Sequence, residues 1–149
     1  MRTIKNFEEF IKENIVKKQS PDYPRANFLI EESAKSYALL IRLQEKLELN
    51  NDTSNLFVKS CYDIIMEMIR AKMLIDGYNA SGFGAHEAEV AYLRILKFSE
   101  HDIQFADQLR FFRNGMLYYG TMLDKEYAEK VIIFTNKIYK KLEDMLPKK

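Results

Sequence analysis

The chain has 149 residues, of which 47% are hydrophobic and 30% are charged. This length fits one domain, residues 1–149, with a hydrophobic core of its own. The 23 Lys and Arg residues nearly balance the 22 Asp and Glu residues, so the net charge of +1 creates no overall field that attracts nucleic acid or anionic lipid. Any binding of such a partner must therefore be local.

Cysteine content and apolar runs indicate where the protein acts. A single cysteine, Cys61, excludes an internal disulfide framework and suits a reducing compartment. No apolar run approaches the ~20 residues of a membrane span, and the N-terminal MRTIKNFEEF has acids where a secretory signal would be apolar. We therefore expect a cytoplasmic protein with no membrane segment.

Apolar residues recur at intervals of three and four, which is the helical period. The spacing predicts six helices, and no segment alternates with period two for long enough to predict a strand. The expected helices cover about Ile4–Lys17, Asp22–Leu49, Asn55–Asn79, Glu87–Phe98, Ser99–Gly120 and Asp124–Leu146. The fold class is therefore all-α: an up-and-down bundle of about five to six helices, built on a long antiparallel hairpin of the second and third helices.

Several residues predict helix ends. Asp52, Thr53 or Ser54 can cap the third helix. Ser99 can cap the fifth, with Asp102 completing an acidic variant of the capping box.

The segment DQLRFFRNGMLYYG, residues 107–120, concentrates polar groups on one helix, which Gly120 is expected to end. At roughly 100° per residue, Asp107, Arg110, Asn114 and Tyr118 share one face, with Arg113 nearby. Two arginines three residues apart can hold one anion with fixed donors that match phosphate. We expect this stripe to line a solvent-reachable groove, whereas the simpler alternative is a solvated face or an interhelix salt bridge.

Other kinds of site lack support in the sequence. Neither His86 nor His101 has a Glu three residues earlier, as the di-iron sites of helical bundles require. One cysteine and two histidines make a structural zinc site improbable, so we expect neither metal nor cofactor. Cys61 lies on the apolar side of its helix and is expected to be a small buried hydrophobe.

Two motifs are informative: RNxxxYYG at Arg113–Gly120, on a helix that begins with His101-Asp102-Ile103, and more weakly HEAxxAYL at His86–Leu93. They resemble the HEPN superfamily of HepT-like helical bundles. The resemblance implies a small, often dimeric bundle. Many members are metal-independent endoribonucleases or toxins that pair with a nucleotidyltransferase-type antitoxin. Their signature is an arginine, usually followed directly by a polar residue, with a histidine four to six residues later.

Arg113 and Asn114 match the first half of this signature, but Tyr118 stands at the histidine position. A phenol with a pKa near ~10 is a poor base at neutral pH. The favoured interpretation is therefore a homodimeric module that binds RNA or a nucleotide phosphate through Arg110, Arg113, Asn114 and Tyr118, with a degenerate ribonuclease site.

Two alternatives stay open. In the first, the protein is an active metal-independent endoribonuclease in which Arg113 is catalytic and Tyr118 or His86 replaces the histidine. This alternative gains support if the loop at His86 folds beside Arg113. In the second, the protein is a purely structural module, most simply the partner of a nucleotidyltransferase.

Overall fold

The all-α fold class is confirmed by the computed structural model, which describes residues 3–119 and 122–147 and the side chains of all of these except 116–119. Within this part of the chain, helices dominate and the strands are confined to one short pair. The elements in chain order are α1 (Phe7–Lys12), β1 (Val16–Lys18), α2 (Tyr23–Lys46), α3 (Ser54–Asp76), β2 (Tyr78–Ala80), α4 (Ala85–Ile95), α5 (Glu100–Tyr119) and α6 (Lys125–Met145).

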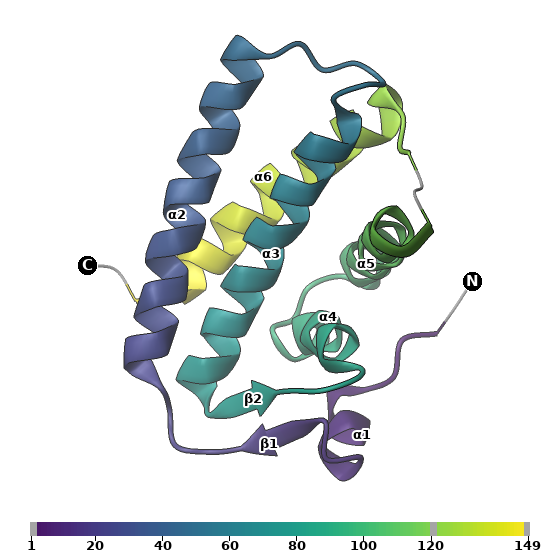
Figure 1. Cartoon of the computed structure of the whole chain (residues 1–149). Coiled ribbons are helices and arrows are strands. Elements are labelled where there is room, and N and C mark those ends of the chain that lie inside the picture. The colour runs from purple at the N-terminus through teal and green to yellow at the C-terminus, as the bar shows by residue number, and fades with distance from the viewer. Residues whose placement is uncertain (1–2, 120–121, 148–149) are drawn as a thin grey trace.

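The expected hairpin of α2 and α3 forms the long axis of the molecule, and α6 packs against α3 at an incline (Figure 1). α3 is the central helix because apolar residues occupy most of its circumference. Its fully buried side chains include Phe57, Cys61, Ile64, Ile69 and Leu74. Every other large element therefore packs on α3 or on a helix that contacts it.

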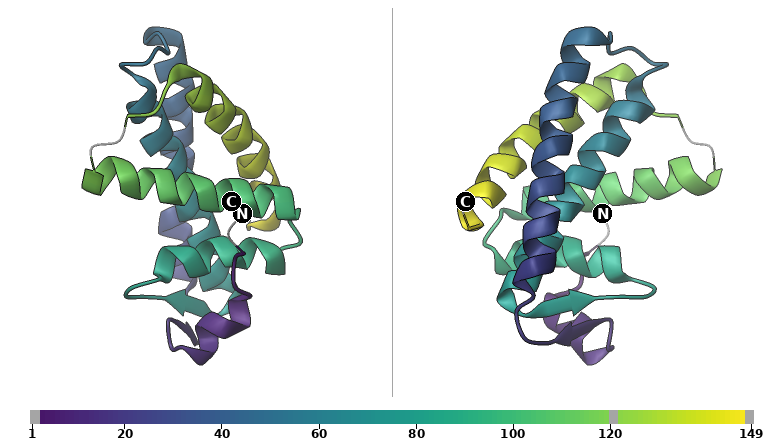
Figure 2. Two further views of the ribbon diagram at one scale, coloured as in Figure 1. Left: turned by 90° about the vertical axis from the view of Figure 1, so that its right-hand side faces the viewer. Right: turned by 60° about the vertical axis from the view of Figure 1, so that its left-hand side comes forward.

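α4 and α5 run across the long hairpin rather than along it, as the views in Figure 2 show. They are consecutive and pack against each other in opposite directions, so the start of α4 lies beside the later turns of α5. Burial of Val90, Leu93, Ile103 and Leu109 holds this pair on the core. The crossing brings residues of α4 and α5 against the side of α3.

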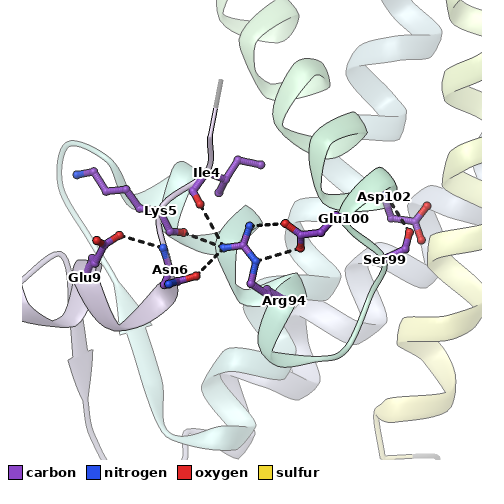
Figure 3. Close-up of polar contacts among 8 residues, drawn as sticks. All are labelled: Ile4, Lys5, Asn6, Glu9, Arg94, Ser99, Glu100 and Asp102. Carbon is purple, nitrogen blue, oxygen red and sulfur yellow. Dashed lines mark hydrogen bonds and ion pairs between the residues drawn. The ribbon is translucent and has the colours of Figure 1, made fainter. Parts of the chain in front are cut away.

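Arg94 lies near the end of α4 and joins the turn between α4 and α5 to the N-terminal segment (Figure 3). Its Nε and Nη2 donate to the carboxylate of Glu100 at 3.0 and 2.8 Å. Its Nη1 donates to the carbonyl of Ile4 at 3.2 Å and to Oδ1 of Asn6 at 2.9 Å. One guanidinium thus joins three segments of the chain.

The first helix is shorter than expected, and a short strand pair was not predicted. α1 ends at Lys12, and Asn14 adopts a left-handed conformation with φ of 62°. The chain then forms β1, which pairs antiparallel with β2 in the register Val16↔Ala80. Strands of three residues are too short to show a period of two, and their pairing depends on a partner far along the chain.

The observed helix caps agree in part with those predicted from the sequence. Ser99 accepts a hydrogen bond from the backbone N–H of Asp102 at 3.1 Å, as expected of an N-cap. The carboxylate of Asp102 does not complete the capping box, because its Oδ1 accepts from Nζ of Lys137 at 2.7 Å. Thr53 occupies the N-cap of α3, but its hydroxyl donates to the carbonyl of Glu48 instead of accepting from the helix.

None of the helices in the described residues is long and apolar enough to cross a membrane.

Candidate functional site

Three helices enclose a polar pocket of about 340 Å³, here called the His86–Arg113 pocket. α3 contributes carboxylates and a guanidinium from one side, α4 contributes an imidazole at its first turn, and α5 contributes a guanidinium and an amide. The polar residues that line it are Asp63, Glu67, Arg70, His86, Arg113 and Asn114. His86 and Arg113 thus share one pocket, which is the arrangement that favours the endoribonuclease alternative.

His86 is held by a buried carboxylate. Its Nδ1 lies 2.9 Å from Oε1 of Glu89, one helical turn further along α4. Glu89 is only 2% exposed and also accepts from Nε and Nη2 of Arg70 at 2.6 and 3.2 Å. A carboxylate on Nδ1 favours the tautomer with a proton there, so Nε2 becomes the available acceptor. The His86 side chain is 58% exposed and accessible to a ligand.

Arg113 lines the same pocket. Its Nε and Nη1 are buried, and neither has a hydrogen-bond partner among the described residues. Asn114, the next residue, lines the pocket with a side-chain amide that can donate and accept. Buried guanidinium donors without partners are costly, and an anion that reached these nitrogens would relieve that cost.

The pocket also contains two carboxyl groups one helical turn apart on α3. Partial burial raises the pKa of Asp63, and the charge of Arg113 opposes that rise. Burial also raises the pKa of Glu67, and the like charge of Asp63 adds to it. These groups retain protons more readily than free carboxyl groups, and when ionised they repel a phosphate placed between them.

Tyr62 also lines the pocket. Its hydroxyl is buried and has no hydrogen-bond partner in the described part of the chain. Burial, followed by the charge of Glu89, raises the pKa of Tyr62 to about 12. The phenol therefore keeps its proton at neutral pH.

The expectation that Arg110 faces an open groove was wrong, because it is only 9% exposed. Asp107 is 6% exposed and lines a different hollow of about 560 Å³ on α5, together with His101 and Phe112. Nε of Arg110 donates to Oδ1 of Asp107 at 3.0 Å, and its Nη2 lies 3.8 Å from Oε1 of Glu87 on α4. Because α4 lies on this face of α5, the pair is an interhelix tie, which was the simpler of the two alternatives.

Tyr118 and Gly120 lie outside the described residues, Tyr118 by its side chain and Gly120 altogether. The motifs of the sequence did not point to Arg70, Glu89, Asp63 and Glu67 as residues of the pocket. One signal for the first two was present: an arginine and a glutamate each lie within an apolar stretch, IIMEMIRAKMLI and AHEAEVAYL. Charged residues embedded among core residues are rarely buried unless paired.

Comparison of the chain with family models, with curated proteins and with solved structures gives no match. In the described residues, no group of three or more His, Cys, Asp or Glu side chains is arranged to hold a metal ion.

Proposed function

We propose that this protein is a HEPN-like domain that binds the phosphate of RNA or of a nucleotide in the His86–Arg113 pocket. One observation carries this proposal. Nε and Nη1 of Arg113 are enclosed without a partner among the described residues, whereas the guanidinium of Arg70 is occupied by Glu89. Charge-assisted hydrogen bonds from a guanidinium to phosphate are among the stronger polar contacts available in proteins.

Asn114 and Tyr62 support the same ligand. Both line the pocket beside Arg113, and each offers a neutral donor. Arg110 is left out of the phosphate site, since Asp107 and Glu87 already surround its guanidinium. The contribution of Tyr118 rests on the resemblance alone.

Arg113→Ala tests this proposal. Binding of a fluorescent oligonucleotide to this variant should weaken at least tenfold in anisotropy titrations. Arg113→Lys should keep part of the affinity because it retains the charge, and should lose the rest because lysine lacks the fork of donors. Affinity should fall as salt rises. The melting temperature should not fall, since the enclosed nitrogens bond to nothing in the described protein. Lys140→Ala, on the exposed side of α6, is the charge-matched control. Equal affinity in Arg113→Ala and Lys140→Ala would refute the phosphate site.

Cleavage of the bound RNA is a second candidate, favoured by the hydrogen bond between His86 and Glu89 beside Arg113. Imidazole exchanges protons near neutral pH, which suits a general base. Nε2 would accept the proton of a ribose 2′-hydroxyl as its oxygen bonds to phosphorus. The bond from phosphorus to the 5′ oxygen breaks, and that oxygen takes a proton from water. Arg113 would stabilise the added charge on the phosphoryl oxygens.

Gel analysis of RNA incubated in EDTA tests this candidate. Cleavage should be visible in the unmodified protein and lost in His86→Gln, which should still bind RNA. Loss of cleavage in Tyr118→Phe would assign the role of the missing histidine to Tyr118, whereas unchanged cleavage would leave that role to His86. Absence of cleavage under all conditions leaves the binding function and removes the catalytic one.

The resemblance also implies a homodimer or a nucleotidyltransferase partner. Exposed apolar side chains support such an interface, since Phe111 is 63% and Ile133 is 70% exposed. Light scattering should give twice the chain mass for a homodimer. A monomer that binds a nucleotidyltransferase encoded nearby would favour the partner-module alternative.

A further inference from the structure

A second hollow adjoins the His86–Arg113 pocket along the side of α3. It has a volume of about 470 Å³ and lies between α2 and α3. Asp63 and Glu67 line both hollows, so these two carboxyl groups form the boundary between them. Each volume falls in the range of roughly 300–1,000 Å³ that is typical of ligand sites.

The combined groove has positive charge on both sides of this boundary. Arg113 lies on the α5 side, and Arg42 and Lys46, one turn apart on α2, lie on the other. Neither Arg42 nor Lys46 has an ion-pair partner within the described residues, so both charges are available to a ligand. Leu39 and Leu43 add apolar contact area next to Arg42.

The order of charges limits the kind of ligand. Phosphates are attracted to the two cationic sides and are repelled by Asp63 and Glu67 between them. A ligand that spans the groove must therefore place hydrogen-bond donors at the centre. A ribose 2′-hydroxyl is such a donor, lies between successive phosphates, and is absent from DNA. The hollows are of nucleotide size, which suits a single strand.

We propose that the groove from Arg113 across Asp63 and Glu67 to Arg42 and Lys46 binds a short single-stranded RNA segment. The phosphates lie on the two cationic sides, the carboxylates accept ribose hydroxyls, and a base packs on Leu39 and Leu43. This inference rests on the proposed phosphate site, because Arg113 supplies one of its two anchors. It adds a second anchor and a preference for RNA over DNA.

The test compares three probes: uridine 5′-monophosphate, an eight-residue oligouridine, and the deoxyuridine oligomer of the same length. The RNA oligomer should bind at least tenfold tighter than the mononucleotide and several-fold tighter than the DNA. In Arg42→Ala/Lys46→Ala, affinity for the RNA oligomer should fall at least fivefold, with the mononucleotide unaffected. The slope of log affinity against log salt should fall by about 1.4, since each lost phosphate contact on a single strand contributes about 0.7.

Lys130→Ala/Lys140→Ala removes the same charge from exposed positions on α6 and should leave the slope unchanged. Asp63→Ala/Glu67→Ala should reduce the preference for RNA over DNA. Gel analysis after each titration checks that the RNA is intact. If the mononucleotide and the oligomer bind equally through Arg113, the extended groove is wrong and the phosphate site stands. If no probe binds, both proposals fail.

Discussion

Oε1 of Glu89 lies 2.9 Å from Nδ1 of His86, while the same carboxylate accepts two hydrogen bonds from Arg70. The buried carboxylate of Glu89 thus holds the imidazole of His86 on α4 and the guanidinium of Arg70 on α3. Glu89→Gln should lower the free energy of unfolding by about 1–3 kcal/mol, because Arg70 loses a charged acceptor. It should also shift the tautomer of His86, which the ring ¹⁵N chemical shifts report.

His86→Gln is the control for this prediction. The ring is largely exposed, so its removal should change the urea midpoint very little. If both variants lose the same stability, the His86–Glu89 contact is a structural element of α4 and the carboxylate does not serve to orient the ring.

Arg94 should stabilise the protein more than its partial exposure suggests. Arg94→Met keeps much of the apolar stem but removes the contacts to Glu100, Asn6 and the backbone of Ile4. We expect a loss of about 1–2 kcal/mol, and thermal unfolding should shift down by roughly 2–8 °C. Glu100→Gln removes only the exposed ion pair, so it should cost well under 1 kcal/mol. Equal melting temperatures for the two variants would contradict this role of Arg94.

Glu67 should make stability depend on pH. Burial raises the pKa of this carboxyl in the folded protein above its value in the unfolded chain. The folded state therefore favours the protonated form, and stability is lost as pH rises through the folded pKa. Glu67→Gln should unfold at higher urea than the unmodified protein at pH 7. The difference should vanish below about pH 4, where both states are protonated. Glu45→Gln, exposed on α2, is the matched control.

Cys61 should be unreactive in the folded protein. It is fully buried, and burial raises its pKa to about 11, so the nucleophilic thiolate is scarce at pH 8. A thiol reagent should label it only when the chain opens, with a rate that follows unfolding as urea is added. Rapid labelling without urea would mean that the core around α3 opens locally.

Helical periodicity predicted α2, α3 and α6 well because each buries a regular stripe against a neighbour. It could not predict β1 and β2, whose pairing depends on residues distant in sequence. Periodicity also shows which residues share a face but not what covers that face. Arg110 was therefore expected in a groove, whereas α4 packs over it and supplies Glu87.

The pocket was partly predictable. The motif at Arg113-Asn114 identified the α5 side, and His86 was named as a possible replacement for the missing histidine. Their proximity depends on the antiparallel packing of α4 on α5, which no local pattern encodes. The apolar stretches around Arg70 and Glu89 indicate that each is buried and paired, but the sequence does not show that they pair with each other until α3 and α4 are placed.

The pairing of β1 with β2 has a consequence for synthesis on the ribosome. Val16 and its neighbours have no strand to join until residues 78–80 emerge, and the ring of Phe7 packs against Tyr78 and Tyr92 from the same later region. At roughly 5–20 residues per second, the N-terminal segment waits several seconds beyond its own translation. During that interval its apolar residues are accessible to chaperones, and nascent-chain crosslinking to such factors should end once α4 has left the exit tunnel.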